Sequence, residues 1–425
     1  MASIIGTSDD DTLDGTPDDD FIDGRGGADI LSGAAGNDEL RGRGGDDSMA
    51  GGIGDDVYYV TEAGDQVIEA AGEGSDKVNT AVSYTLAAGQ EIEHLQVRGS
   101  AGLTLTGNEF DNILTGGDGA DVLDGGSGRD RVNGGAGNDT ITSTGQKANI
   151  KAGDGDDTIR LDGTTSSTGS VDGGAGDDTV RSTNIGTFTF QNVETLDTYY
   201  GFLTGSVAQI ASFDSFTADL AAPDTQISFS LRGTGGTLDF TTGISGQNSI
   251  EIRDAGLTSA IQITGSVNDD RMFGSTFDDT LSGGNGKDTL LGGDGSDTLA
   301  GGDGKDQLNG GTGNDQLTGG GGADFFIFNT SFEAGTNIDL VADFTSGNDL
   351  FQLDQTFYFL GLTVGPLAAA QFATGSATGN GPQIVYVQAS GALFYDSNGA
   401  NAGGASQFAT VAGAPALTAA DFRVV

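Results

Sequence analysis

Cysteine and tryptophan are absent from the sequence, histidine occurs once, and proline occurs only 5 times in 425 residues. Without cysteine, no disulfide can hold the fold and no thiolate can bind a metal or act as a nucleophile. A single histidine excludes the His-Glu-x-x-His motif of zinc proteases, which needs two. That histidine, His94, lies in a stretch of alternating apolar and polar residues, which is typical of an exposed strand residue. No apolar run approaches the ~18 residues of a membrane span, so we expect no membrane insertion.

Positive charge is also scarce. The chain has 17 Lys and Arg residues against 62 Asp and Glu residues, which gives a formal net charge of -45. Nucleic acid is not an expected partner, because contacts to phosphate need Lys and Arg. A compact fold with this surplus of negative charge repels itself unless cations neutralise it.

What the sequence does contain is a nine-residue period of glycine and aspartate. The unit reads Gly-Gly-x-Gly-x-Asp-x-U-x, where U is apolar, as in residues 292–300. The glycine half predicts a turn and the last three residues predict a short strand. One apolar residue per unit makes a core only if the units stack into a solenoid. The sixth place is held by Asp11, Asp20, Asp29, Asp38, Asp47, Asp56, Asn112, Asp121, Asp130, Asp139, Asp157, Asp178, Asp270, Asp279, Asp288, Asp297, Asp306, Asp315 and Asp324.

Carboxylates aligned in this way would repel one another, because stacked strands lie only about 4.8 Å apart. Calcium removes the difficulty, since it accepts six to eight oxygen ligands, including backbone carbonyls. Magnesium demands stricter octahedral geometry, and zinc and copper prefer His and Cys. We therefore predict that the sixth-place residues bind several calcium ions.

Two units of the middle block depart from the pattern. They keep the spacing and the apolar residues Ile150 and Val171, but they place Ala148 and Gly169 where the ligand should be. The calcium sites around 143–172 are therefore in doubt.

The repeats resemble the nonapeptide of the RTX family. The motif match is specific and covers 6–59, 107–181 and 265–327. The resemblance implies an all-β fold, a right-handed parallel β-roll in which two nonapeptides make one coil and calcium lies between the turns on each side. It also implies a protein secreted through the type I machinery of a Gram-negative bacterium, which we expect at the cell surface or outside the cell.

The remaining segments divide the chain further. We predict a first repeat block over 1–59, a β-rich spacer that continues the solenoid over 60–106, and a second, irregular block over 107–181. Residues 182–264 lose the Asp period and predict a calcium-free part of the solenoid or, less favoured, a β insert. A third block over 265–327 precedes residues 328–425, which resemble the C-terminal region of type I export substrates and predict a β-rich cap.

We expect a non-enzymatic protein, because the repeats and the spacer and capping segments around them occupy nearly the whole chain. The favoured hypothesis is a calcium-dependent structural protein that self-associates into a surface layer, an extracellular filament or a biofilm matrix. The repeats start almost at the first residue, so we expect an uncapped first coil that another molecule could complete. The alternatives are a secreted hydrolase or its accessory module, and an adhesin that binds cell-surface polysaccharide.

Overall fold

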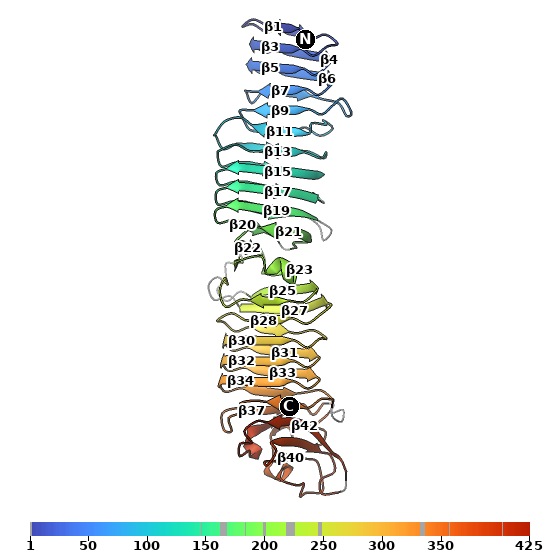
Figure 1. Cartoon of the computed structure of the whole chain (residues 1–425), viewed down its shortest axis with the longest axis vertical. Helices are drawn as coiled ribbons and strands as arrows, with labels where there is room; N and C mark the ends of the chain where they lie inside the picture. Colours follow the sequence, from blue (N-terminus) through green and yellow to red (C-terminus); the bar gives the residue numbers. More distant parts are fainter. Residues whose placement is uncertain are drawn as a thin grey trace. The chain divides into compact units, whose positions relative to one another are not determined.

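The structure is a computed structural model that describes residues 2–145, 147–161, 168–182, 184–198, 201–217, 226–244, 249–331, 336–356, 358–401 and 403–425. The chain forms two compact units. Unit 1 comprises Met1–Asp197 with Ser212–Asp214, and unit 2 comprises Thr198–Ala211 with Ser215–Val425. In each unit, short strands are stacked as rungs, coil upon coil (Figure 1).

Unit 1 contains one long sheet of eleven strands whose neighbours in the sheet all pair in parallel. We call it sheet A. Its strands are β1 (Ser3–Ile5), β3 (Phe21–Gly26), β5 (Glu39–Gly44), β7 (Val57–Val60), β9 (Lys77–Thr80), β11 (His94–Val97), β13 (Ile113–Thr115), β15 (Arg129–Ala136), β17 (Lys147–Asp154), β19 (Thr168–Ala175) and β21 (Thr187–Gln191).

The strands between those of sheet A in the sequence form the other wall of unit 1. A four-stranded sheet contains β2 (Thr12–Asp14), β4 (Ile30–Ala35), β6 (Ser48–Ile53) and β8 (Gln66–Ile68). A further parallel ladder contains β10 (Tyr84–Thr85), β12 (Thr104–Thr106), β14 (Val122–Asp124), β16 (Thr140–Ser143), β18 (Thr158–Leu161), β20 (Thr179–Arg181) and β22 (Thr195–Asp197).

The register shows that two nonapeptides make one coil. Ile22 pairs with Leu40 in sheet A, and Leu31 pairs with Met49 on the other wall. The apolar residue of each repeat therefore stacks on the one two repeats later. All of these eighth-place side chains are buried except Leu13, which is half-buried in the first coil. The predicted parallel β-roll is confirmed.

Unit 2 repeats this architecture with two sheets of ten strands. The first contains β23 (Phe202–Ser206), β25 (Gln226–Gly233), β27 (Ser249–Leu257), β29 (Arg271–Phe273), β31 (Thr289–Asp294), β33 (Gln307–Thr312), β35 (Phe325–Phe328), β37 (Leu350–Leu353), β43 (Phe422–Val424) and β38 (Gly365–Pro366). The second contains β26 (Thr237–Asp239), β28 (Gln262–Thr264), β30 (Thr280–Gly286), β32 (Thr298–Gly304), β34 (Gln316–Gly322), β36 (Asp339–Val341), β42 (Ala405–Val411), β41 (Ala392–Asp396), β40 (Gln383–Val387) and β39 (Phe372–Thr374). Strand β24 (Ser215–Thr217), helix α1 (Val207–Ile210) and the single-turn helices Ala369–Gln371 and Ala419–Asp421 complete the described elements.

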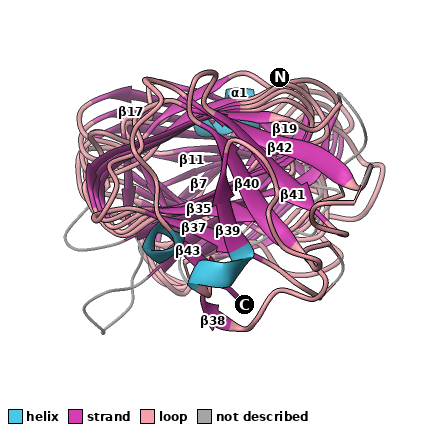
Figure 2. Cartoon of the chain, turned by 90° about the horizontal axis from the view of Figure 1, so that it is seen from below, coloured by secondary structure: helices cyan, strands magenta, loops and turns pink. Residues whose placement is uncertain are grey.

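The last strands of unit 2 change direction. Strand β41 pairs in antiparallel fashion with both β40 and β42, beside the short helical turns of this region (Figure 2). Phe351 of β37 stacks on Phe344 and Phe422, with ring centroids 4.2 and 4.9 Å apart. Residues 328–425 thus cover the last coil of the solenoid with an aromatic core.

The segments between the blocks continue the ladders. Strands β9 and β11 of the spacer pair in register with β7 before them and with β13 after them. From the segment 182–264, β21 extends sheet A and β27 pairs with β29 of the third block. In the part of the chain that the structure describes, no helix has the length and apolar composition needed to cross a membrane.

Candidate metal centres

The sixth-place residues lie where the glycine turns enter the strands, and their side chains face inward. All of those predicted from the sequence are buried except Asp11, which is half-buried. One row contains Asp20, Asp38, Asp56, Asp76, Glu93, Asn112 and Asp130, linked by backbone–side-chain hydrogen bonds and by strand register.

The first carboxylate oxygen of each residue holds the neighbouring coil. The backbone N–H of Asp20 donates to Oδ1 of Asp38 (2.7 Å), and that of Asp38 donates to Oδ1 of Asp56 (2.6 Å). The same bond recurs in unit 2, where the N–H of Asp288 donates to Oδ1 of Asp306 (2.8 Å). The Asp period is therefore a structural device as well as a candidate ligand set.

The second oxygen is buried and, among the described residues, has no hydrogen-bond donor in most repeats. We call these residues the open carboxylates. They are Asp29, Asp38, Asp47, Asp56, Asp76, Asp130, Asp139, Asp157, Asp178, Asp288, Asp297, Asp306, Asp315 and Asp324. A buried charged oxygen without a partner is costly, and a cation is the group that satisfies it.

The first-place glycine leaves the space around this oxygen clear. A Cβ on Gly283 would lie 2.2 Å from Oδ2 of Asp288, and one on Gly292 would lie 2.2 Å from Oδ2 of Asp297. Any larger residue would occupy the position beside the carboxylate. The arrangement of buried carboxylates and glycine turns fits calcium, a hard cation with oxygen ligands.

In other sixth-place residues, a side-chain oxygen accepts a backbone hydrogen bond from the second place of the same repeat, and we call them the closed residues. The backbone N–H of Thr16 donates to Oδ2 of Asp20 (2.7 Å), and that of Ser275 donates to Oδ2 of Asp279 (2.5 Å). The other predicted sites with such a bond from the second place are Asp11, Asp121, Asp270 and, through its amide oxygen, Asn112.

The backbone at the second place separates the two classes. In repeats with an open carboxylate, this residue has a positive φ, as at Gly293 (119°) and even at Arg25 (74°). In repeats with a closed residue, the second-place residue has no positive φ, and its backbone N–H donates to the sixth-place side chain. Closed residues stand in the first coils of each block.

The row that contains Asp130 ends in the second block. Asp130 pairs with Ala148, which pairs with Gly169, which pairs with Phe188. Ser143 takes the first-place position of the Ala148 unit, where repeats with an open carboxylate commonly have glycine. No carboxylate stands in this row at the two doubtful units, although residues 164–167 of the second one lie outside the described residues.

Burial raises the pKa of open carboxylates in the second and third blocks. The pKa rises from 3.8 to about 8 for Asp288 and to about 7 for Asp297, with burial as the largest cause in both. In the second block, burial raises the pKa of Asp130 and Asp139 to about 7. A metal that binds here near neutral pH competes with protons.

Sequence reasoning missed several acids that continue the rows. Asp65 and Asp76 in the spacer, and Asp339 and Asp349 in the C-terminal region, accept the same backbone hydrogen bond as the repeat residues. Each precedes an apolar residue by two positions, as in the repeats, but the nine-residue count is broken around them. A search for Asp-x-apolar without fixed spacing would have found them.

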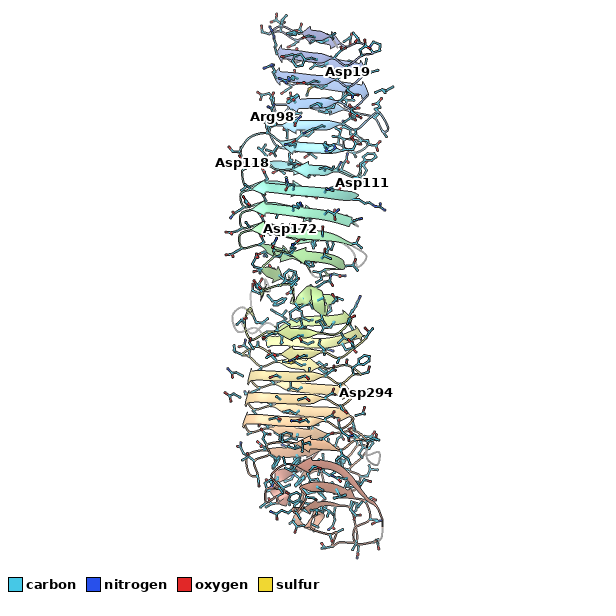
Figure 3. All side chains as sticks on the ribbon, viewed as in Figure 1. Asp19, Arg98, Asp111, Asp118, Asp172 and Asp294 are labelled. Carbon is cyan, nitrogen blue, oxygen red and sulfur yellow. The ribbon has the colours of Figure 1, made fainter. Side chains whose placement is uncertain are left out.

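A second set of acids lies on the outside of the turns. The N–H of Asn37 donates to Oδ1 of Asp19 (2.9 Å), and the N–H of Arg129 donates to Oδ1 of Asp111 (2.9 Å). Asp19 and Asp111 are exposed and project from the edge of the ladder (Figure 3). These side chains join neighbouring coils at the surface.

Comparison with known proteins identifies the repeat. The model of the RTX calcium-binding nonapeptide repeat matches residues 5–40, 23–58, 106–141, 170–183, 264–299 and 300–329. One curated relative, the endo-1,3-1,4-beta-glycanase ExsH of Rhizobium meliloti, is 47% identical over 58 residues, which are 14% of this chain and 12% of that protein. A solved subunit of the mannuronan C5-epimerase of Azotobacter vinelandii matches 36% of this chain and 77% of its own length, with 28% identity and a TM-score of 0.19.

The repeat model covers parts of all three blocks, and the open carboxylates stand at its sixth place. RTX repeats bind calcium. The chain therefore contains RTX calcium-binding nonapeptide repeats.

Proposed function

We propose that this chain is a secreted structural protein whose solenoid forms when its repeats capture extracellular calcium. The observation that supports this most directly is the set of buried Oδ2 atoms without donors, present in all three blocks. In low calcium these carboxylates repel one another and oppose compaction. At the calcium levels outside cells, sites of this kind are filled, since extracellular modules bind in the range of about 10⁻⁴–10⁻³ M.

The export route follows from the same chemistry. A chain that stays open in the calcium-poor cytoplasm can pass through the type I secretion machinery, and calcium then folds it outside. Binding energy and folding energy are one quantity in such a system.

Calcium titration of the full chain, followed by far-UV circular dichroism, tests the proposal. We expect little β signal in EGTA and a cooperative rise as calcium is added. Full β content and protease resistance after exhaustive EGTA dialysis would contradict it. Magnesium at equal concentration is the matched control and should fold the chain less well.

We further propose that the folded protein self-associates into a surface layer, filament or matrix. Among the described strands, β1 lies at one edge of sheet A and pairs with β3, beside half-exposed Ile5. Such an edge accepts strands from other molecules. Light scattering should show growth on adding calcium, and a monomer at every calcium concentration would refute the assembly role.

A second candidate function is the binding of an acidic polysaccharide. A groove with a volume of about 870 Å³ runs over β15, β17, β19 and β21 on the outer face of sheet A. Its polar lining forms in-register rows, Arg131–Asn149–Ser170 and Asn133–Lys151–Asp172. Asp172 lies over this part of the ladder in Figure 3.

The groove places two cations in a chain of strongly negative charge, which favours an anionic ligand. Binding of purified alginate and pectate to the chain, compared with the double variant Arg131→Gln/Lys151→Gln, tests this. Product formation from either polymer would instead favour the hydrolase alternative. His94 is half-buried on β11, outside the groove lining.

A further inference from the structure

Three acids meet where the first block passes into the spacer, and only one of them, Asp56, belongs to the nonapeptide pattern. Asp56 precedes β7, Glu69 follows β8, and Asp76 precedes β9. Each offers one carboxylate oxygen, and these three oxygens all lie within 4.8 Å of one another. The side chains are buried, with 0%, 5% and 1% of their surface exposed.

Glu69 stands where the preceding coil has a first-place glycine. It follows Ile68, which pairs with Ala50, so its position corresponds to that of Gly51. Asp20 and Asp38 are linked across 18 residues, whereas Asp56 and Asp76 are linked across 20, and both additional residues lie between Glu69 and Asp76. The site therefore has three carboxylates, Asp56, Glu69 and Asp76.

In each of these carboxylates, one oxygen is held and the other has no donor among the described residues. Oδ1 of Asp56 accepts the N–H of Asp38 (2.6 Å), and Oδ1 of Asp76 accepts the N–H of Asp56 (2.9 Å). The partnerless atoms are Oδ2 of Asp56, Oε2 of Glu69 and Oδ2 of Asp76.

Tyr58 positions the glutamate. This residue occupies the eighth place, between Leu40 and Val78 of the neighbouring coils, and its ring is fully buried. Its hydroxyl accepts the N–H of Gly51 (2.6 Å) and donates to Oε1 of Glu69. A phenol in the apolar column thus fixes the carboxylate, with Oε2 left without a partner.

The charges at this point are unbalanced. No cationic side chain forms an ion pair with the three acids in the described part of the chain. Either protons or a cation must neutralise them.

We propose that Asp56, Glu69 and Asp76 bind one calcium ion at a site that adds Glu69 to two open carboxylates of the repeat row. Three carboxylates and no nitrogen or sulfur ligand suit a hard divalent cation. The third carboxylate adds negative charge, and ligand charge sets the affinity of calcium sites. This ion would stabilise the longer coil, through which the solenoid continues from the first block into the spacer. The proposal adds to the calcium-dependent folding proposed above.

Ion counting on the full chain tests the site. We expect Glu69→Gln to lose one calcium ion per chain in equilibrium dialysis, with the rest retained. The amide is isosteric with a protonated glutamate, so the variant should still reach the wild-type β signal at saturating calcium. Glu62→Gln is the matched control, because Glu62 is an exposed spacer acid outside the cluster, and it should lose none.

Terbium luminescence gives a second measurement. The chain has no tryptophan, so a bound Tb³⁺ is sensitised through tyrosine, and Tyr58 lies beside the site. Calcium should displace this signal in the wild type, and both Glu69→Gln and Tyr58→Phe should reduce it severalfold. Equal ion counts in Glu69→Gln and wild type would mean that Glu69 is merely protonated, and the site would be rejected. Failure of calcium-dependent folding would appear differently, as a wild type that keeps its β content in EGTA.

Discussion

The second and third repeat blocks each have stacked, buried apolar residues at the eighth place, but they differ in their carboxylates. In the third block, Asp270, Asp288, Asp306 and Asp324 form one row, and Asp279, Asp297 and Asp315 form the other. In the second block one row is complete from Asp121 to Asp178, while the other stops at Asp130. Ile150 and Val171 stay buried where the acids are lost. The comparison shows that the apolar core and the candidate metal ligands are separable parts of the repeat.

Removing calcium should produce the largest contrast between the blocks. Hydrogen exchange measured by mass spectrometry should show loss of amide protection throughout 265–327 in EGTA. We expect residues 143–172 to change least, because one edge there has no carboxylate row to be neutralised. An equal loss of amide protection in both blocks would show that the carboxylate rows do not govern local stability.

Removing a single candidate ligand should have the next largest effect on calcium-dependent folding. Asp288→Ala should raise the calcium concentration at the folding midpoint by at least about tenfold, since even indirect changes at metal sites cost this much. Asp139→Ala should do the same in the complete row of the second block. The exposed acids Asp303 and Asp118 provide controls, and their Ala variants should leave the midpoint unchanged.

Restoring the missing carboxylate should make the second block resemble the third. The double variant Ser143→Gly/Ala148→Asp supplies both the acid and the first-place glycine that leaves room for its Oδ2. We expect the double variant to melt at a higher temperature than the wild type in calcium. In EGTA we expect no such increase. Ala148→Asp alone should destabilise the chain, because Ser143 would crowd the new carboxylate. A gain from the single variant would contradict this account of the glycine.

Lowering the pH should partly replace calcium in stabilising the fold, with a smaller effect than the changes above. The folded pKa of Asp288 (about 8) and of Asp297 (about 7) lies above the ordinary value of 3.8. The metal-free fold therefore binds more protons than the unfolded chain, and its stability falls as pH rises from about 4 to about 8. In EGTA, β content should increase as the pH is lowered through this range. Saturating calcium should remove the trend, and a metal-free chain that gains structure at high pH would refute it.

Much of this could be predicted from the sequence because the repeat is local and strict. The period placed Leu290 and Leu308 in one column and Asp288 and Asp306 in one row, as the register shows. Stacking identical units needs no knowledge of distant contacts. The parallel solenoid follows from the period itself.

The remaining features depend on geometry that the period does not contain. Whether Asp279 is closed or Asp297 open depends on the backbone φ at the second place, which the motif does not state. Glu69 takes a first-place position in a coil that is two residues longer, and the motif has glycine rather than an acid at that place. The antiparallel strands β40 and β41 depend on contacts with distant parts of the chain.

The closed turns at the start of each block have a consequence for the order of assembly. A turn such as Thr16–Asp20 or Ser275–Asp279 secures itself with its own hydrogen bonds and needs no ion. It can serve as a seed, which presents a finished surface to the following coil. If calcium folds the chain as proposed, each ion captured would complete the template for the next coil, and a block would grow from its first coil onward.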